Sequence, residues 1–308
     1  MRESGTWDYE GLIRKVHVYF ARAREHPRAD GEIFALWLLL GLEFLLRAPL
    51  ARVSPMLLAD LNGDALMHAA GFPGKPGAEP KSVPLTTVIQ RLSRIVDGFD
   101  QDRQNDAVIL VGLRNRELHS SEAAMTVNES KWLPRFMRIV DVIGPHLGLD
   151  PVFLLGEQVV KQARALVDAE DRRLERETKQ RVEARRAFFA ELHEDEVAAR
   201  RDMVPHIGDA LLPWPGEAAN CPSCATLIGV ESEPVRTTDE RLQGGGIYRD
   251  VIYVVTGMSC PVCGLELKST AEVSCAGLQQ QYMKHEYESL EDRFLQDYEP
   301  DEDEDEDE

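Results

Sequence analysis

Apolar residues recur at helical spacing through the first 150 residues of the chain, and this periodicity predicts an all-α helical bundle. In residues 7–24 the apolar side chains fall on one side of a helix, which predicts an amphipathic segment. Residues 32–46 are apolar nearly all round, a pattern typical of a helix at the centre of a bundle. Capping and breaking residues divide the remainder into further expected helices over 54–70, 87–99, 104–119 and 130–147.

The next segment, residues 151–204, has a long and highly charged helical pattern with few apolar residues. Its arginines alternate with acidic residues, so ion pairs between residues four apart are expected to support a solvated connecting helix. Two alternatives stay open, namely a coiled coil and an arginine face that contacts RNA. Three prolines, Pro205, Pro213 and Pro215, then predict a linker.

A small β-containing module is predicted over residues 216–275. Within it, residues 247–256 are rich in Val, Ile and Tyr and follow a run of glycines, which predicts a strand after a turn. Residues 276–298, rich in Tyr, Gln and Glu, are predicted to form a C-terminal helix. Residues 299–308 are almost all acidic and predict a disordered tail, which would serve solubility or mimic a nucleic-acid backbone.

Charge is distributed unevenly along the 308 residues, a length that suggests two domains. Residues 1–150 hold 18 Lys and Arg against 19 Asp and Glu, and residues 151–201 hold 11 of each. Residues 202–308 hold 6 against 24, a net charge of -18, and still carry -10 without the eight acids at the end. Such a charge opposes a polyanion, so it disfavours a transcription-associated protein that binds DNA through its C-terminal module.

Targeting signals are not evident in the N-terminal residues, which are mixed and charged. The longest apolar run, residues 33–46, has 14 residues and contains Glu43, which makes it too short and too polar for a membrane span. Five cysteines, four of them in pairs, indicate metal ligands rather than disulfides in a chain without an export signal. The chain is therefore expected in the cytoplasm, without a membrane partner.

Two Cys-x-x-Cys motifs bracket the predicted β-module, with Cys221 and Cys224 at its start and Cys260 and Cys263 near its end. Four thiolates in this arrangement are the ligand set of a tetrahedral zinc site, and the module is similar to a zinc ribbon. Four sulfur ligands leave no open position for water, so one structural Zn²⁺ is expected to hold a small fold together. Cys275 is left over and is expected to be a buried or idle thiol.

The candidate chemistry lies in residues 114–119, which read Arg-Asn-Arg-Glu-Leu-His inside a helical run. Asn115 and His119 are one turn apart and share a face of a helix with 3.6 residues per turn. Arg114 starts about 140° from His119, so only its long side chain, or that of a second copy, would reach the same phosphate. Histidine and arginine suit RNA cleavage, because imidazole exchanges protons near neutral pH and a guanidinium binds phosphate oxygens.

This motif resembles that of the ribonucleases in the HEPN superfamily, in which an arginine and a polar residue are followed by a histidine. Residues 41–48 are similar to the early HEPN helix that carries a glutamate followed by a basic residue, and residues 132–136 are similar to the start of its closing helix. The resemblance covers residues 8–148. It implies a homodimer in which two motifs face each other across a cleft, form one composite site and leave cyclic phosphate ends.

The resemblance implies that Arg114, Asn115 and His119 are the catalytic residues, while Arg116 occupies a variable position and at most contacts a phosphate. RNA supplies its own nucleophile, the 2′-hydroxyl, so no catalytic metal is expected. The favoured function is a metal-independent endoribonuclease, and the resemblance implies a toxin or an antiviral defence effector. The zinc ribbon would select RNA or hold a partner, which includes a neutralising or recruiting protein. The alternative is a non-catalytic adaptor whose modules bind protein or RNA, and the two functions are distinguished by whether His119 is required.

Overall fold

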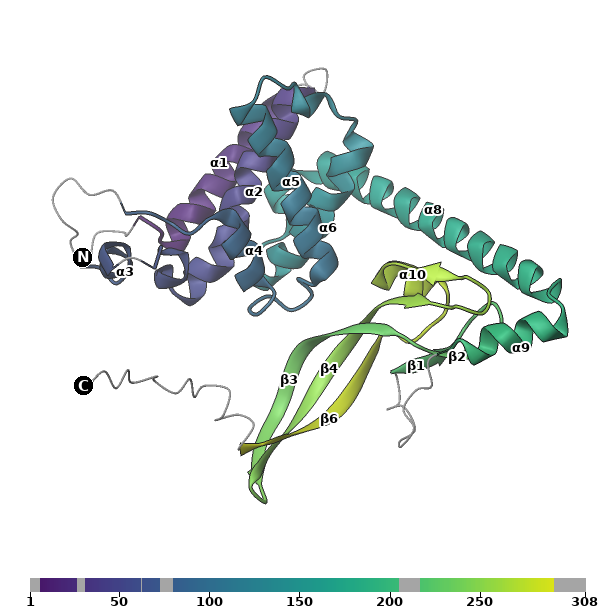
Figure 1. Ribbon diagram of the computed structural model, residues 1–308. Helices are drawn as coiled ribbons and strands as arrows, with labels where there is room; N and C mark the ends of the chain where they lie inside the picture. Colours follow the sequence, from purple (N-terminus) through teal and green to yellow (C-terminus); the bar gives the residue numbers. More distant parts are fainter. Residues whose placement is uncertain (1–5, 27–30, 62, 73–79, 205–216, 291–308) are drawn as a thin grey trace, which may run out of the picture. The chain divides into compact units, whose positions relative to one another are not determined.

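The computed structural model describes residues 6–26, 31–61, 63–72, 80–204 and 217–290. The chain divides into two compact units, Met1–Asp171 and Arg172–Glu308. The first unit, the helical unit, is a set of helices, and the second contains an antiparallel sheet (Figure 1). The second unit also holds a cluster of four cysteines, and we call it the cysteine unit. The prediction of a mostly helical chain with a small β-containing part near its C-terminus is therefore confirmed.

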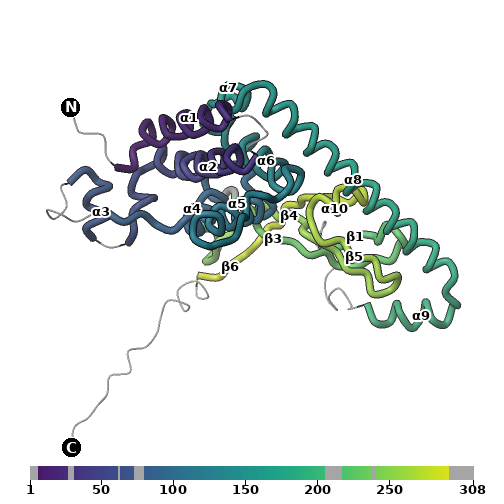
Figure 2. The backbone as a smooth tube through the Cα atoms, turned by 90° about the horizontal axis from the view of Figure 1, so that it is seen from above, coloured from purple at the N-terminus to yellow at the C-terminus, as the bar shows by residue number. Residues whose placement is uncertain are grey.

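The helical unit is a bundle in which the first two helices lie side by side (Figures 1 and 2). Aspartate and asparagine side chains cap three of its helices: Asp8 accepts from the Gly11 N–H, Asp100 from the Arg103 N–H and Asn128 from the Ser130 N–H. The elements are α1 (Tyr9–Glu25), α2 (Gly31–Val53), a 3-10 turn (Pro55–Leu58), α3 (Gly63–Ala69), α4 (Leu85–Leu92), α5 (Gln101–His119), a second 3-10 turn (Ala124–Thr126), α6 (Glu129–Leu147), α7 (Pro151–Leu155) and the first part of α8 (Glu157–Ala190).

The core of the helical unit is built around α2, as its apolar sequence predicts. Phe34, Leu38, Leu42, Leu45 and Leu46 of this helix are almost completely buried. At 23 residues α2 is longer than predicted, and by length and composition alone it could cross a membrane. Because 67% of its most apolar window is buried inside the bundle, this is weak evidence for a membrane span, and core helices commonly meet the same criterion.

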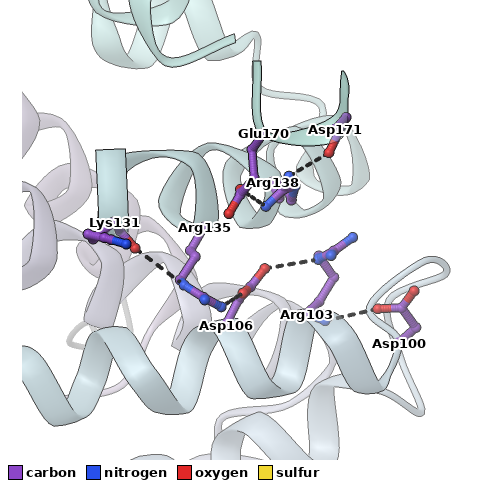
Figure 3. A network of polar contacts seen from close by, with 8 residues as sticks. All are labelled: Asp100, Arg103, Asp106, Lys131, Arg135, Arg138, Glu170 and Asp171. Carbon is purple, nitrogen blue, oxygen red and sulfur yellow. Dashed lines mark hydrogen bonds and ion pairs between the residues drawn. The ribbon is translucent and has the colours of Figure 1, made fainter. Parts of the chain in front are cut away.

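Two groups of polar contacts join α5 to α6 and α6 to the first part of α8 (Figure 3). Asp106, on the buried side of α5, binds Arg135 Nη1 of α6 at 2.6 Å and has Arg103 Nε at 3.5 Å. Arg138 of α6 donates to Glu170 and to Asp171 of α8, each at 2.7 Å. A charge as buried as Asp106 is stable only when it is paired, so this network fixes the position of α5 in the bundle.

The predicted single helix over residues 151–204 is wrong, because the structure divides it into α7, α8 and α9 (Glu194–Asp202). Gly156, at φ 85° and ψ 151°, ends α7, and the backbone of His193, at φ -69° and ψ 150°, is extended before α9. The boundary between the two units lies within α8, so that helix belongs partly to each unit instead of forming a separate connecting domain after residue 150. Ion pairs between residues four apart are present on α8 as predicted, for example Lys179 with Glu175 at 2.6 Å.

The second unit contains two antiparallel sheets. Strands β1 (Ala218–Asn220) and β2 (Leu227–Gly229) form a small hairpin. The larger sheet places β4 (Gly246–Ser259) between β3 (Glu231–Gln243) on one side and β5 (Glu266–Leu267) and β6 (Gln281–Ser289) on the other. Gly244 and Gly245 connect β3 to β4 with φ values of 60° and 85°, which glycine adopts without strain. A short helix, α10 (Thr270–Cys275), precedes β6.

The predicted C-terminal helix over residues 276–298 is wrong where the structure describes it, because residues 281–289 form strand β6. This segment forms an antiparallel pair with β4, and the pairing places tyrosines of the two strands opposite each other, which stabilises a sheet. Tyr287 lies 4.9 Å from Tyr248 and Tyr282 stacks on Tyr253 at 5.3 Å between ring centroids. The predicted acidic tail, residues 299–308, and the predicted linker prolines lie outside the described residues.

Candidate functional site

Helix α5 carries the predicted catalytic motif in its last turn and a half. Its buried side consists of Asp106, Ala107, Leu110 and Leu113, which pack into the bundle. The helix ends at His119, where the Ser120 N–H donates to the carbonyl oxygen of Arg116. The motif residues therefore lie at the end of a helix whose opposite face is anchored in the core.

Arg114 is largely buried and forms an ion pair with α2. Its Nη2 lies 2.8 Å from Glu43 Oε2, and the side chains are 13% and 24% exposed. The other carboxylate oxygen of Glu43 accepts from Arg47 Nη2 at 3.3 Å. Arg47 also donates to the Val83 carbonyl oxygen at 3.4 Å. The two guanidiniums thus share one carboxylate at the boundary between α2 and α5.

Burial lowers the pKa of Arg47, and the nearby positive charge of Arg114 adds to this effect, whereas Glu43 opposes it. Glu43 is therefore the group that compensates two partly buried cations. Glu43 lies in the apolar run of residues 33–46 and falls within the resemblance over residues 41–48, but it was not predicted as a site residue. The available signal was a single carboxylate within an otherwise apolar helix, which requires a partner.

Replacing Glu43 with glutamine is expected to lower the free energy of unfolding of the helical unit by about 1–3 kcal/mol, because two guanidiniums lose their shared counter-charge. Urea denaturation followed by circular dichroism measures this change. Glu32→Gln, on the exposed first turn of α2, is the control and should change stability by no more than about 0.5 kcal/mol. Equal losses for the two variants would contradict the assigned role of Glu43.

Asn115 and His119 share one side of α5, as their spacing predicts, and the structure shows that this side is exposed. Among the residues that the structure describes, neither side chain has a hydrogen-bond or ion-pair partner. Arg116 is 61% exposed and has Glu122 at 3.9 Å. The structure therefore places Arg114 against α2 and His119 in solvent, so the two side chains do not contact each other within one chain.

The exposed face of α5 is unusually apolar for a solvated helix. Val108 and Ile109 are 50% and 48% exposed, and Leu118 is 44% exposed. A side-chain carbon added at Gly112 would meet no atom within 4 Å. Val108, Gly112, Asn115 and His119 recur at helical spacing, so the polar motif residues continue a smooth apolar stripe.

The second candidate site is the four-cysteine cluster, and here the predicted residues are brought together. The Sγ atoms of Cys221, Cys224, Cys260 and Cys263 all lie within 4.8 Å of one another and all four residues are buried. Sγ separations of 3.5 Å (Cys221–Cys263) and 3.6 Å (Cys224–Cys260) are close to the roughly 3.8 Å expected for tetrahedral bonds of about 2.3 Å. The four residues can therefore bind one metal ion.

The two cysteine pairs are held by matching turns. The Cys221 N–H donates to Thr226 O and the Ala225 N–H to Cys221 O, both at 2.9 Å. In the second turn, Cys260 N–H donates to Leu265 O and Gly264 N–H to Cys260 O, both at 2.8 Å. Backbone conformation is shared as well, because φ is 57° at Ala225 and 72° at Gly264.

Ala225→Gly is expected to raise the free energy of unfolding of the cysteine unit by about 0.5–1 kcal/mol, because alanine is strained at positive φ. Gly264→Ala should lower it by about 1 kcal/mol or more, since its new methyl group would also lie 3.4 Å from Arg185 Nη1. Thermal unfolding of the metal-loaded chain measures both. If the two substitutions change the free energy of unfolding in the same direction, backbone strain at positive φ does not explain their effects.

Helices α8 and α9 fasten both turns of the cysteine unit. Arg186 Nη2 donates to Pro222 O at 2.8 Å, and Arg200 Nη1 donates to Val262 O at 3.2 Å. Ser223 Oγ donates to Val182 O at 2.9 Å. Pro222, Ser223 and Val262 all lie between paired cysteines, so these hydrogen bonds from α8 and α9 orient the ligand turns.

The thiols of the cluster have unequal pKa values, because they differ in hydrogen bonding and burial. The Cys221 thiol donates toward Cys260 and lowers the pKa of Cys260 to about 5, whereas burial raises the pKa of Cys263 to about 11. A cation would take the place of these protons.

No protein-family model, curated protein or solved structure matches the chain.

Proposed function

We propose that the chain is a HEPN-type, metal-independent endoribonuclease that acts as a homodimer. The observation that carries the proposal is the ion pair between Arg114 and Glu43. It joins the motif helix to the segment of α2 whose sequence is similar to the early HEPN helix. The same helix end leaves His119 and Asn115 accessible, as a site for an external substrate requires.

The proposed reaction uses groups that the motif supplies. His119 accepts the proton of a ribose 2′-hydroxyl, and the 2′-oxygen attacks the adjacent phosphorus. The bond from phosphorus to the 5′-oxygen breaks, and that oxygen takes a proton from an imidazolium, which leaves a 2′,3′-cyclic phosphate and a 5′-hydroxyl. Arg114 stabilises the charge of the crowded phosphate, with Glu43 holding the guanidinium in place. Asn115 orients His119 or bonds to the phosphate.

A second copy of the chain supplies what one chain lacks. Arg114 and His119 make no contact within one chain, so the composite site requires two antiparallel copies of α5 that meet at their last turns. With the twofold axis near residues 116–117, an arginine of one chain is level with the histidine of the other. The apolar stripe of α5 offers the contact, and Gly112 permits close approach of two helices.

Leu118→Glu is expected to weaken the dimer about a hundredfold or more, because Leu118 is 44% exposed in the last turn of α5 and two carboxylates would meet near the twofold axis. Sedimentation or light scattering measures the oligomeric state, and RNA cleavage should fall in parallel. Val53→Glu is the matched control, because Val53 is also exposed, at 62%, but lies at the end of α2. A Leu118→Glu chain that remains dimeric and active would exclude this interface.

We infer that the four thiolates hold one structural Zn²⁺, which stabilises the small cysteine unit and leaves no ligand position for substrate. The proposed roles of this unit are to select RNA or to hold a partner protein. The proposed location is the cytoplasm. The proposed cellular role, a toxin or antiviral effector, requires that His119→Ala removes toxicity without unfolding the chain.

An adaptor without catalytic activity is the second candidate. It is favoured by the separation of the motif side chains within one chain, since Arg114 lies against α2 while His119 is exposed on another side of α5. The deciding experiment incubates pure chain with total RNA and EDTA in a short reaction, with circular dichroism recorded to verify the fold, and maps the new ends. Cyclic phosphate ends support the nuclease, and intact RNA supports the adaptor.

A further inference from the structure

A row of aromatic rings bracketed by two cations lies along the surface between α1 and α2. Lys15 Nζ is 4.8 Å from the centre of the Phe44 ring, and Arg22 Cζ is 4.9 Å from that of Trp37. Tyr19 lies between the two rings, 5.2 Å from Phe44 and 5.5 Å from Trp37. We call these five residues the cation–aromatic ladder.

The ladder is a regular, surface-exposed feature. Lys15 and Arg22 are seven residues apart on α1, and Trp37 and Phe44 are seven residues apart on α2, so the two cation–ring pairs are separated by about 10 Å. The two helices lie side by side in both views (Figures 1 and 2). Lys15 and Arg22 are exposed, while the three rings are half-buried.

Packing of α1 on α2 does not require these cations. Val16, Phe20, Leu38 and Leu42 fill the interface beneath the ladder and are almost completely buried. Within the part of the chain that the structure describes, no carboxylate forms an ion pair with either ladder cation. The net charge of α1 is also positive, since its four basic residues outnumber Glu10 and Glu25.

Uncompensated cations beside a row of aromatic rings match the chemistry of single-stranded nucleic acid. Phosphates pair with the cations, and unstacked bases lie on rings or on a guanidinium plane. A duplex keeps its bases stacked and cannot use the rings. Charge complementarity therefore favours a polyanion, and the rings favour one with exposed bases.

We propose that the cation–aromatic ladder binds single-stranded RNA and leads it to the candidate site on α5. This inference rests on the proposed nuclease function and names its substrate class. The path is short, because Phe44 of the ladder is next in the chain to Glu43, which binds Arg114. A strand that crosses α2 would contact the ladder on one flank and the motif on the other.

The test measures binding of a labelled single strand of about twelve nucleotides, within the usual range of site sizes, to chain carrying His119→Ala. Lys15→Ala with Arg22→Ala should weaken binding tenfold or more and reduce the slope of log affinity against log salt by about 1.4, or roughly 0.7 per lost phosphate contact. Arg24→Ala with Lys161→Ala removes equal charge from exposed positions outside the ladder and should change the affinity less than threefold.

Ring variants test stacking separately from charge. Tyr19→Leu should weaken binding about tenfold, and Tyr19→Phe should restore it because the ring is retained. RNA should quench the fluorescence of Trp37, since the other tryptophans that the structure describes, Trp7 and Trp132, are buried. Trp37→Phe should remove this quenching and keep the affinity.

Unchanged affinity and salt slope in a folded Lys15→Ala, Arg22→Ala chain would overturn the ladder proposal, as would an equal loss in the control pair. If the ladder variants weaken the binding of duplex RNA as much as that of single-stranded RNA, the assignment to single strands is overturned. An altered oligomeric state with normal RNA affinity would make the ladder a protein contact instead. If the wild type cuts RNA while ladder variants bind normally, only the ladder fails. If they lose binding but the wild type cuts nothing, only the nuclease function fails.

Discussion

Removing the metal is expected to unfold the cysteine unit while the helical unit stays folded. The unit has a small core to which the four cysteines themselves contribute, so it has little to replace the metal–thiolate bonds. The proposed structural zinc would contribute about 10–16 kcal/mol at neutral pH, comparable to or more than the whole stability of a typical small domain. Acidification should act in the same direction, because protons compete for the thiolates as the pH falls.

Calorimetry of the full chain with and without a strong chelator measures this effect. Two thermal transitions are expected in the loaded chain, and only the one belonging to the cysteine unit should disappear. Cys263→Ser should reproduce the loss, whereas Cys275→Ser, which changes a cysteine outside the cluster, should leave both transitions in place. If both transitions survive chelation, the cluster does not hold the unit together.

His119→Ala is expected to reduce RNA cleavage about 10³-fold without lowering the stability of the helical unit. General acid–base groups typically contribute between about 10²- and 10⁴-fold, and His119 is proposed to serve in proton transfer. Its exposed side chain makes no hydrogen bond to another described residue, so its removal leaves no unpaired group behind. The rate of cleavage of a defined RNA and the unfolding curve are measured on the same sample.

Arginine variants refine this prediction. Arg114→Lys should not restore the activity lost in Arg114→Ala, because an ammonium cannot replace the planar fork that binds Glu43 and a phosphate. Arg116→Ala is the matched control, since Arg116 is 61% exposed and lies outside the proposed catalytic positions. Arg116→Ala should lower the rate of RNA cleavage less than about tenfold. A larger loss for Arg116→Ala than for Arg114→Ala would reverse the assigned roles.

Local patterns predicted much of the architecture and one of the two sites. The helices of the bundle follow from apolar periodicity and capping residues. The cysteine cluster follows from two short motifs whose turns need only a few residues to form. The spacing of Asn115 and His119 likewise placed both on one face of α5, and the structure shows that this face is exposed. Whether a second chain completes that face depends on association, which helical periodicity does not encode.

The wrong predictions concern segments with competing local preferences. Residues 281–289 contain glutamate and glutamine, which suit a helix, but also alternating side chains that suit a strand. The available edge of β4 decided between them. Similarly, the charged helical pattern after residue 150 continues through Gly156 and His193 without a visible break in the sequence. The non-helical backbone at these two residues divides the segment into α7, α8 and α9.

The sequence by itself determined most of the bundle helices, the four cysteines that can bind a metal and the shared face of Asn115 and His119, because each depends on short local patterns. Only the tertiary structure decided that Glu43 holds Arg114, that residues 281–289 form a strand and that α8 belongs to both units. Those outcomes depend on groups far apart in the chain. Their free energy comes from pairing and burial that exist only after folding.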